Sequence, residues 1–82
     1  MRLSPNEILF QEGDVAGSGF VVTEGEIQLV QRSAGSTVSV GRLGAGSVVN
    51  ELALISETLR PATAVATQKS EVIKIRRSLF RR

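Results

Sequence analysis

The sequence of 82 residues contains no cysteine, no histidine, no tryptophan and no tyrosine, and only three phenylalanines. Without cysteine the chain has no disulfide, no thiol nucleophile and no thiolate metal ligand. The lack of histidine removes the commonest metal ligand and the commonest general base. Few aromatic side chains also argue against a stacking platform for single-stranded nucleic acid. We therefore expect a binding domain and not an enzyme, with no metal and no bound cofactor.

The sequence also lacks any long apolar run. A membrane-spanning helix needs about eighteen or more such residues. The first seven residues, MRLSPNE, do not have the charged and then apolar layout of a signal peptide. We expect a cytoplasmic chain without membrane contact, whose residues 1–82 form a single domain of a longer protein.

Charge is distributed unevenly along the chain. Residues 1–74 carry eight acidic and six basic side chains, a net charge of −2, so we expect no direct binding of nucleic acid by this part. The remaining charge comes from Arg76, Arg77, Arg81 and Arg82. Such a cluster is typical of a solvated helix face, with contact to phosphate as the alternative.

Short apolar runs separated by turns predict a mainly β protein. All eight glycines lie in the first 46 residues, between these runs. Ser33 to Ser36 has the character of a hairpin turn. Many short strands with frequent turns are typical of a sandwich, a jelly roll or a small barrel. The expected strands are 7–10, 20–22, 27–30, 37–40, 62–67 and 71–75.

The pattern changes from Val48 onward. Residues 50–55 are good helix formers that follow Asn50, a residue able to cap a helix, so a short helix is expected there. Pro61 has a fixed φ and favours an extended conformation of the preceding Arg60. A second helix is expected to begin within 77–82, capped by Ser78.

The segment 50–63 is the part of the sequence that could carry chemistry. The start of a short helix offers free backbone N–H groups that favour an anion. Arg60 lies nine residues after Glu51, and its planar guanidinium could donate two parallel hydrogen bonds to phosphate oxygens. Glu51 could accept hydrogen bonds from hydroxyl groups beside that anion. The alternative from spacing alone is a surface ion pair between the two, worth about 0–1 kcal/mol.

The same segment resembles the phosphate-binding cassette of the cyclic nucleotide-binding domain family. The family pattern is Gly-Glu-Leu-Ala followed by Arg-(Ala/Ser)-Ala-Thr, and here it reads NELA at 50–53 and RPAT at 60–63. Three further fragments resemble the family in the correct order: FQEGD at 10–14, FVVTEGEI at 20–27 and LGAG at 43–46. The resemblance implies a mainly antiparallel β-roll of the jelly-roll type (a double-stranded β-helix), with a short helix in the cassette and the start of a helix at the C-terminus.

The resemblance also implies roles for individual residues. Glu51 would contact the ribose 2′-hydroxyl, and Arg60 would pair with the cyclic phosphate of cAMP or cGMP. Backbone N–H groups of Leu52 and Ala53 would help to hold that phosphate. The other residues expected at the ligand are Asn50, Pro61, Ala62, Thr63, which matches the family's closing threonine, and Val40 and Val49, which would face the base.

Two residues depart from the family pattern. Asn50 replaces the usual glycine; asparagine tolerates a left-handed backbone but adds bulk near the nucleotide. Pro61 replaces a residue whose backbone N–H usually donates to the phosphate, and proline has no N–H. A hydrogen bond to a charged group contributes about 1.5–3 kcal/mol, so its loss weakens binding by about ten-fold or more.

Two main hypotheses for function follow from the resemblance. The first is a regulatory module that binds a cyclic nucleotide and signals to an effector domain or protein outside this segment, with a homodimer left open. The second is a degenerate roll that serves in structure or protein interaction without a nucleotide. An enzyme of the cupin type is disfavoured because histidine ligands are missing. Direct DNA binding is disfavoured because no helix-turn-helix pattern is present.

Overall fold

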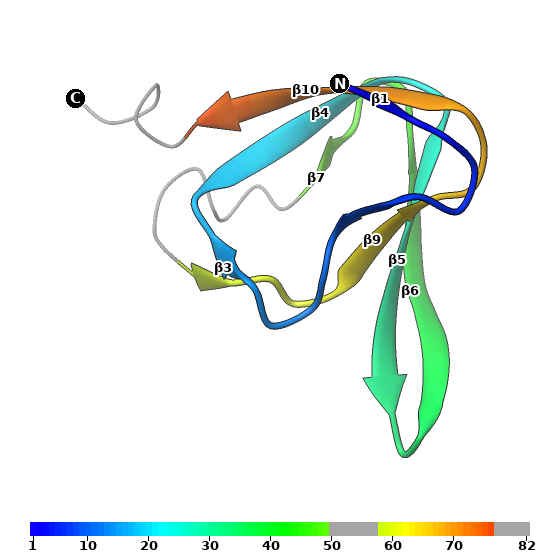
Figure 1. Cartoon of the computed structure of the whole chain (residues 1–82), viewed down its shortest axis with the longest axis vertical. Coiled ribbons are helices and arrows are strands. Elements are labelled where there is room, and N and C mark those ends of the chain that lie inside the picture. Colours follow the sequence, from blue (N-terminus) through cyan, green and yellow to red (C-terminus); the bar gives the residue numbers. More distant parts are fainter. Residues whose placement is uncertain (50–57, 77–82) are drawn as a thin grey trace.

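The computed structural model describes residues 1–49 and 58–76. This part of the chain consists of antiparallel strands joined by turns and short loops (Figure 1). The strands are β1 (Arg2–Leu3), β2 (Ile8–Phe10), β3 (Val15–Ala16), β4 (Ser18–Glu24), β5 (Glu26–Ser33), β6 (Ser36–Gly44), β7 (Val48–Val49), β8 (Thr58–Leu59), β9 (Thr63–Ala66) and β10 (Ser70–Arg76).

The strands form two four-stranded sheets and one two-stranded ribbon. The orders are β1-β10-β4-β7 and β2-β9-β5-β6, and the ribbon pairs β3 with β8. Strands that are neighbours in a sheet are often far apart in the sequence, as in the pairing of β4 with β10 or of β5 with β9. Because strands that are distant in the sequence pair with each other, the chain forms a roll and not a simple meander.

The interior of the roll is apolar. Along β9, Ala64 and Ala66 are fully buried and alternate with the half-buried Thr63 and Val65, as expected for a strand with one face on the core. Val22 of β4 and Val72 of β10 are cross-strand partners with no exposed surface. The core consists of Leu3, Phe10, Phe20, Val22, Ile27, Val49, Ala64, Ala66 and Val72.

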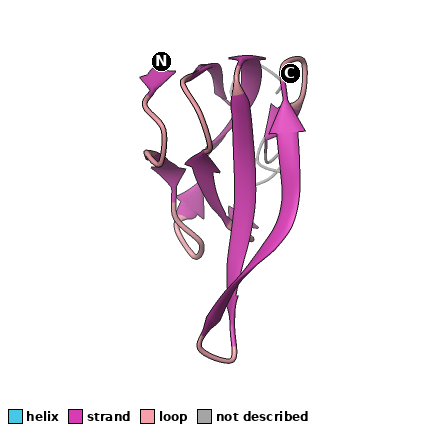
Figure 2. Ribbon diagram, turned by 90° about the vertical axis from the view of Figure 1, so that its right-hand side faces the viewer, coloured by secondary structure: helices cyan, strands magenta, loops and turns pink. Residues whose placement is uncertain are grey.

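Strands β5 and β6 form a long hairpin that extends beyond the rest of the molecule (Figures 1 and 2). Its two-residue turn has positive φ at Ala34 (50°) and Gly35 (81°), which is the geometry of a type I′ turn. The hairpin turn expected at 33–36 is therefore present. Strand β6 extends to Gly44, four residues past the end of the strand expected at 37–40.

The pair Val48–Val49 belongs to a strand, although the sequence pattern changes at this point. β7 pairs with β4, where Val49 lies opposite Phe20 and Val48 opposite Val21. Val49 is fully buried, so its place in the interior of the roll determines the local conformation. A two-residue strand leaves no periodicity that a sequence pattern could reveal.

The expected mainly β fold with antiparallel pairing is confirmed. No helix occurs within the described ranges 1–49 and 58–76. The helices expected at 50–55 and within 77–82 lie outside the described residues.

Gly25, between β4 and β5, is required by both backbone conformation and space. Its φ is +88°, a region that side chains with a Cβ rarely adopt. A Cβ at this position would overlap the Ser70 hydroxyl and lie 2.7 Å from Ser70 Cα. The Ser70 hydroxyl accepts a hydrogen bond from the Glu26 backbone N–H at 3.1 Å and donates one to the Gln68 carbonyl at 2.8 Å. The turn therefore has no room for a methyl group.

We expect Gly25→Ala to lower the free energy of unfolding by about 3 kcal/mol, because left-handed strain and steric overlap act together. Gly35→Ala is the matched control: its φ is also positive, but nothing lies within 4 Å of an added Cβ. It should cost about 1 kcal/mol from strain alone. Urea denaturation of both variants measures the difference, and equal losses would show that the overlap at Ser70 is relieved without cost.

Candidate ligand site around Arg60

Arg60 follows β8 and is held by its backbone. Its N–H donates to the Asp14 carbonyl at 2.7 Å, and its own carbonyl accepts the Gly13 N–H at 2.9 Å. These two bonds extend the β3–β8 pairing by one residue, as the extended conformation that precedes a proline allows. Side chains alternate along this segment, so Leu59 is 60% exposed while Arg60 is only 7% exposed. The arginine side chain therefore enters the interior of the roll.

The Arg60 guanidinium lies against two aromatic rings. Its Cζ is 4.2 Å from the centre of the Phe10 ring and 5.5 Å from the centre of the Phe20 ring. The two rings are stacked, with centroids 5.9 Å apart and an interplanar angle of 27°. Nη1 donates to the Ser18 carbonyl at 2.8 Å. With the described residues, the group thus forms one hydrogen bond and two cation–π contacts, and cation–π contacts are worth most where the cation is desolvated.

The described neighbours of Arg60 compensate the positive charge of its guanidinium only in part. Nε of Arg60 is buried and has no hydrogen-bond partner in the described ranges 1–49 and 58–76. Burial lowers the pKa of the guanidinium, and the Asp14 carboxylate opposes this shift more weakly. Among the described residues the ion pairs are Arg2–Glu71 and Arg42–Glu26, and neither involves Arg60. A buried cation without a carboxylate partner is costly, and an anion that reached it would offset that cost.

The three residues after Arg60 have different environments. Pro61 is exposed, and its carbonyl accepts a hydrogen bond from Gln31 Nε2 at 2.7 Å. Ala62 is buried at 3% exposure. Thr63 begins β9, and its Oγ1 accepts the Glu12 backbone N–H at 2.9 Å. Only Arg60 among these four extends a charged group into the interior.

The two valines expected near the base are separated. Val49 is fully buried beside Phe20, and Phe20 also contacts the Arg60 guanidinium. Val40 lies on β6 and is 50% exposed. It is the additional residue of an irregularity in the ladder, because Leu29 pairs with Gly41 and Val30 with Ser39. The structure thus groups Val49 with Arg60 but places Val40 on the projecting hairpin.

Four of the expected ligand residues cannot be located. Asn50, Glu51, Leu52 and Ala53 lie outside the described residues, so the structure describes the arginine end of the cassette and not the glutamate end.

Sequence reasoning did not identify the residues that surround Arg60. Phe10 and Phe20 are two of only three phenylalanines, which is the one signal in the sequence that could have drawn attention to them. Ser18 acts through its backbone carbonyl, which no sequence pattern reveals. Gln31 is separated from Pro61 by 30 positions.

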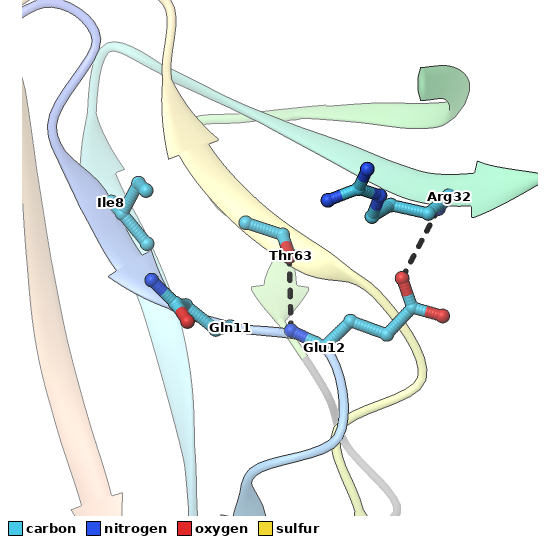
Figure 3. Close-up of a pocket in the computed structure, with 5 residues that line it drawn as sticks. All are labelled: Ile8, Gln11, Glu12, Arg32 and Thr63. Carbon is cyan, nitrogen blue, oxygen red and sulfur yellow. Dashed lines mark hydrogen bonds between the residues drawn. The ribbon is translucent and has the colours of Figure 1, made fainter. Parts of the chain in front are cut away.

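A separate surface pocket of about 470 Å³ lies beside the cassette (Figure 3). Figure 3 shows the Glu12 backbone bonded to Thr63 and the Glu12 carboxylate accepting the Arg32 N–H at 3.2 Å. Arg60 is not among its lining residues. They are Ile8, Gln11, Glu12, Arg32 and Thr63.

The described residues contain neither a cluster of metal ligands nor a membrane-spanning helix. In the described part of the chain, no group of three or more aspartate or glutamate side chains is arranged to hold a metal ion. No helix within those residues is long and apolar enough to cross a membrane.

Comparison with curated proteins identifies relatives in fungal enzymes. The chain is 32% identical over 81 residues to lysophospholipase nte1 of Aspergillus fumigatus. It is 30% identical over 82 residues to lysophospholipase nte1 of Neurospora crassa. Both matches cover 98% of this chain but only 5% of the relative's length.

Comparison with solved structures identifies the same roll in bacterial proteins. A cyclic nucleotide-binding-like protein from Brucella abortus matches with a TM-score of 0.85 and 35% identity, over 98% of this chain and 71% of that chain. The N-terminal domain of a transcriptional regulator from Streptomyces coelicolor matches with a TM-score of 0.91 and 28% identity, over 95% and 55%. The catabolite activator protein of Thermus thermophilus matches with a TM-score of 0.88 and 25% identity, over 98% and 39%.

The family model of the cyclic nucleotide-binding domain matches residues 1–82. This match agrees with the antiparallel roll and with the resemblance of segments 10–14, 20–27, 43–46 and 50–63. The chain therefore belongs to the cyclic nucleotide-binding domain family, a family of regulatory ligand-binding domains.

Proposed function

We propose that this domain binds cAMP or cGMP and signals its presence to an effector outside residues 1–82. The observation that carries the proposal is the buried Arg60 guanidinium, which has an unpartnered Nε and no ion pair among the described residues. A cyclic phosphate is an anion of the size and charge that a planar guanidinium can bind with two parallel hydrogen bonds. Glu51, at the other end of the cassette, supplies the acceptor for the ribose hydroxyl in this proposal.

The fold is compatible with either nucleotide. The EAL enzyme Bd1971 has a roll that matches this chain with a TM-score of 0.88, and it has been solved with cAMP bound and with cGMP bound. At 20% identity this likeness concerns the fold alone. The choice between the two nucleotides therefore depends on the test below.

One observation favours a domain that has kept the roll and lost the ligand. The Arg60 guanidinium already has the Ser18 carbonyl and the two phenylalanine rings as partners. Pro61 also removes a backbone donor from the cassette. A domain that serves only in structure or protein interaction would bind no nucleotide, and replacing Arg60 would leave its behaviour toward nucleotides unchanged.

Isothermal titration with cAMP and with cGMP at millimolar concentration tests the proposal directly. We expect heat of binding for at least one of them, and a rise in melting temperature because the ligand binds only the folded state. Arg60→Met should weaken binding by about a hundred-fold or more, since two charge-assisted hydrogen bonds are lost. 5′-AMP is the control for a phosphate without the ring. The proposal is wrong if neither cyclic nucleotide gives heat or a thermal shift.

Arg60→Met should not destabilise the ligand-free domain. The substitution removes a buried charge with an unpartnered Nε and leaves an apolar chain against Phe10 and Phe20. We expect the melting temperature to stay constant or to rise by a few degrees, measured by circular dichroism without nucleotide. A fall of more than about 8 °C, roughly 1–2 kcal/mol for a domain of this size, would show that Arg60 is primarily structural.

Pro61→Ala should strengthen nucleotide binding. Alanine restores a backbone N–H at the position where family members donate to the phosphate, and such a bond contributes about 1.5–3 kcal/mol. Part of this gain is offset, because the turn loses the rigidity of proline and a more flexible site loses more entropy when it binds. We expect the dissociation constant to fall by about ten-fold in the same titration. An unchanged or weaker affinity would mean that the phosphate does not reach the N–H of residue 61.

A further inference from the structure

The carbonyl of Pro61 is the one backbone group of that residue that can form a hydrogen bond, since proline has no N–H. Its partner is the side chain of Gln31, whose Nε2 donates to it at 2.7 Å. The neighbouring Arg60 is held by its two backbone bonds to Gly13 and Asp14. The turn between Arg60 and Thr63 is thus held by bonds to two other segments, and the bond to β5 depends on a single side chain.

Gln31 lies on the face of β5 that packs on the core. It lies on the same face of the strand as Ile27, which is fully buried, and Leu29, which packs against the core. Gln31 itself is half-buried and lies opposite Val38 of β6. An amide on the inner face of the projecting hairpin is therefore directed at the cassette.

We propose that Gln31 is a positioning residue for the Arg60 site. Its amide fixes the Pro61 carbonyl, and the ring fixes φ of Pro61, so the peptide units on both sides of this residue have defined orientations. Arg60 then presents its guanidinium from one preferred direction. This preorganisation reduces the entropy that must be lost when an anion binds. The inference rests on the proposed function, because it names the residue that prepares the site for its phosphate.

The adjacent residue supplies a second connection between the hairpin and the cassette. The Arg32 backbone N–H donates to the Glu12 carboxylate, and the Glu12 N–H donates to Thr63 (Figure 3). This connection passes through the 11–14 loop, whereas the Gln31 bond is direct. A movement of the hairpin is therefore coupled to the orientation of Pro61, and through it to Arg60.

Substitutions at Gln31 separate a positioning role from a merely structural one. Gln31→Met keeps the length of the side chain and removes the donor. Gln31→Glu keeps the shape but offers only acceptor oxygens at neutral pH, and Gln31→Lys restores a donor. Gln28 is the matched control, because it lies on the same strand and its Nε2 donates to Ser39 Oγ at 3.0 Å within the hairpin. The same three substitutions at Gln28 measure how much a change of charge on β5 by itself alters the binding of an anionic ligand.

We expect the dissociation constant for the bound nucleotide, cAMP or cGMP, to rise by about three- to ten-fold in Gln31→Met and Gln31→Glu. Gln31→Lys should stay within about two-fold of the unmodified protein once the change seen in Gln28→Lys is subtracted. The Gln28→Met variant should bind like the unmodified protein. An equal loss in Gln31→Lys and Gln31→Met, or no loss in Gln31→Met, would overturn the inference.

A second measurement makes the result independent of nucleotide binding. In the ligand-free protein, the Arg60 Nε–H signal in nitrogen-15 NMR reports how firmly the guanidinium is held. Its hydrogen exchange should be several-fold faster in Gln31→Met than in Gln31→Lys or Gln28→Met. If the unmodified protein binds no cyclic nucleotide, the proposed function fails and this comparison alone decides the role of Gln31. Equal exchange rates in all variants would refute the positioning role of Gln31. If Gln31→Met does not fold, the comparison of Gln31→Glu with Gln31→Lys decides in its place.

Discussion

The candidate site depends above all on the burial of one guanidinium. Arg60 lies at 7% exposure against Phe10 of β2 and Phe20 of β4, and it follows β8. β2 and β4 belong to the two large sheets and β8 to the small ribbon, so this side chain connects the end of the ribbon to both large sheets. Removing a charge from water is costly unless partners replace the solvent. Here ring faces and the Ser18 carbonyl replace it in part, while Nε has no partner among the residues that the structure describes. Such a group lowers the stability of the roll, and in the proposed function the binding of an anion offsets this cost.

The departure of the cassette from the family pattern has a structural counterpart. Pro61 removes a donor that could meet a phosphate, and the same residue is tied through its carbonyl to Gln31. Thr63 does not extend toward Arg60; its hydroxyl oxygen accepts the Glu12 N–H on the outer side of the sheet. The anion-binding capacity of the described part of the cassette therefore rests on a single guanidinium. The remaining donors that the resemblance implies, the N–H groups of Leu52 and Ala53, belong to the segment outside the described residues.

Periodicity in the sequence predicted the longer strands well, because Ile27 to Val30 and Ala62 to Thr67 alternate with a period of two. It could not reveal β1, β3, β7 and β8, which have two residues each and owe their conformation to distant partners. The resemblance indicated Arg60 and implied a phosphate-binding role for it, which stays a prediction. The burial of Arg60 could not be predicted, since the alternation past β8 is too short to recognise in the sequence. The contacts of Arg60 with Phe10 and of Pro61 with Gln31 join residues that lie 50 and 30 positions apart in the sequence. Such contacts arise from the topology of the roll, and no local pattern contains them.

A sensor must make different contacts with and without its ligand, because a ligand shifts a conformational equilibrium only by its differential affinity for the two states. In the proposed sensor, the contacts of Arg60 are those that an anion would have to replace. The guanidinium donates a hydrogen bond to the Ser18 carbonyl of β4, which lies 42 positions earlier in the sequence. An anion that claimed the same N–H groups would have to compete with that carbonyl and draw the side chain away from the two rings. The link between β4 and the end of β8 would then weaken while the cassette gained a partner. The cost of breaking the first set of contacts is subtracted from the affinity for the anion, so in the proposed sensor weak binding and an effective switch have the same physical origin.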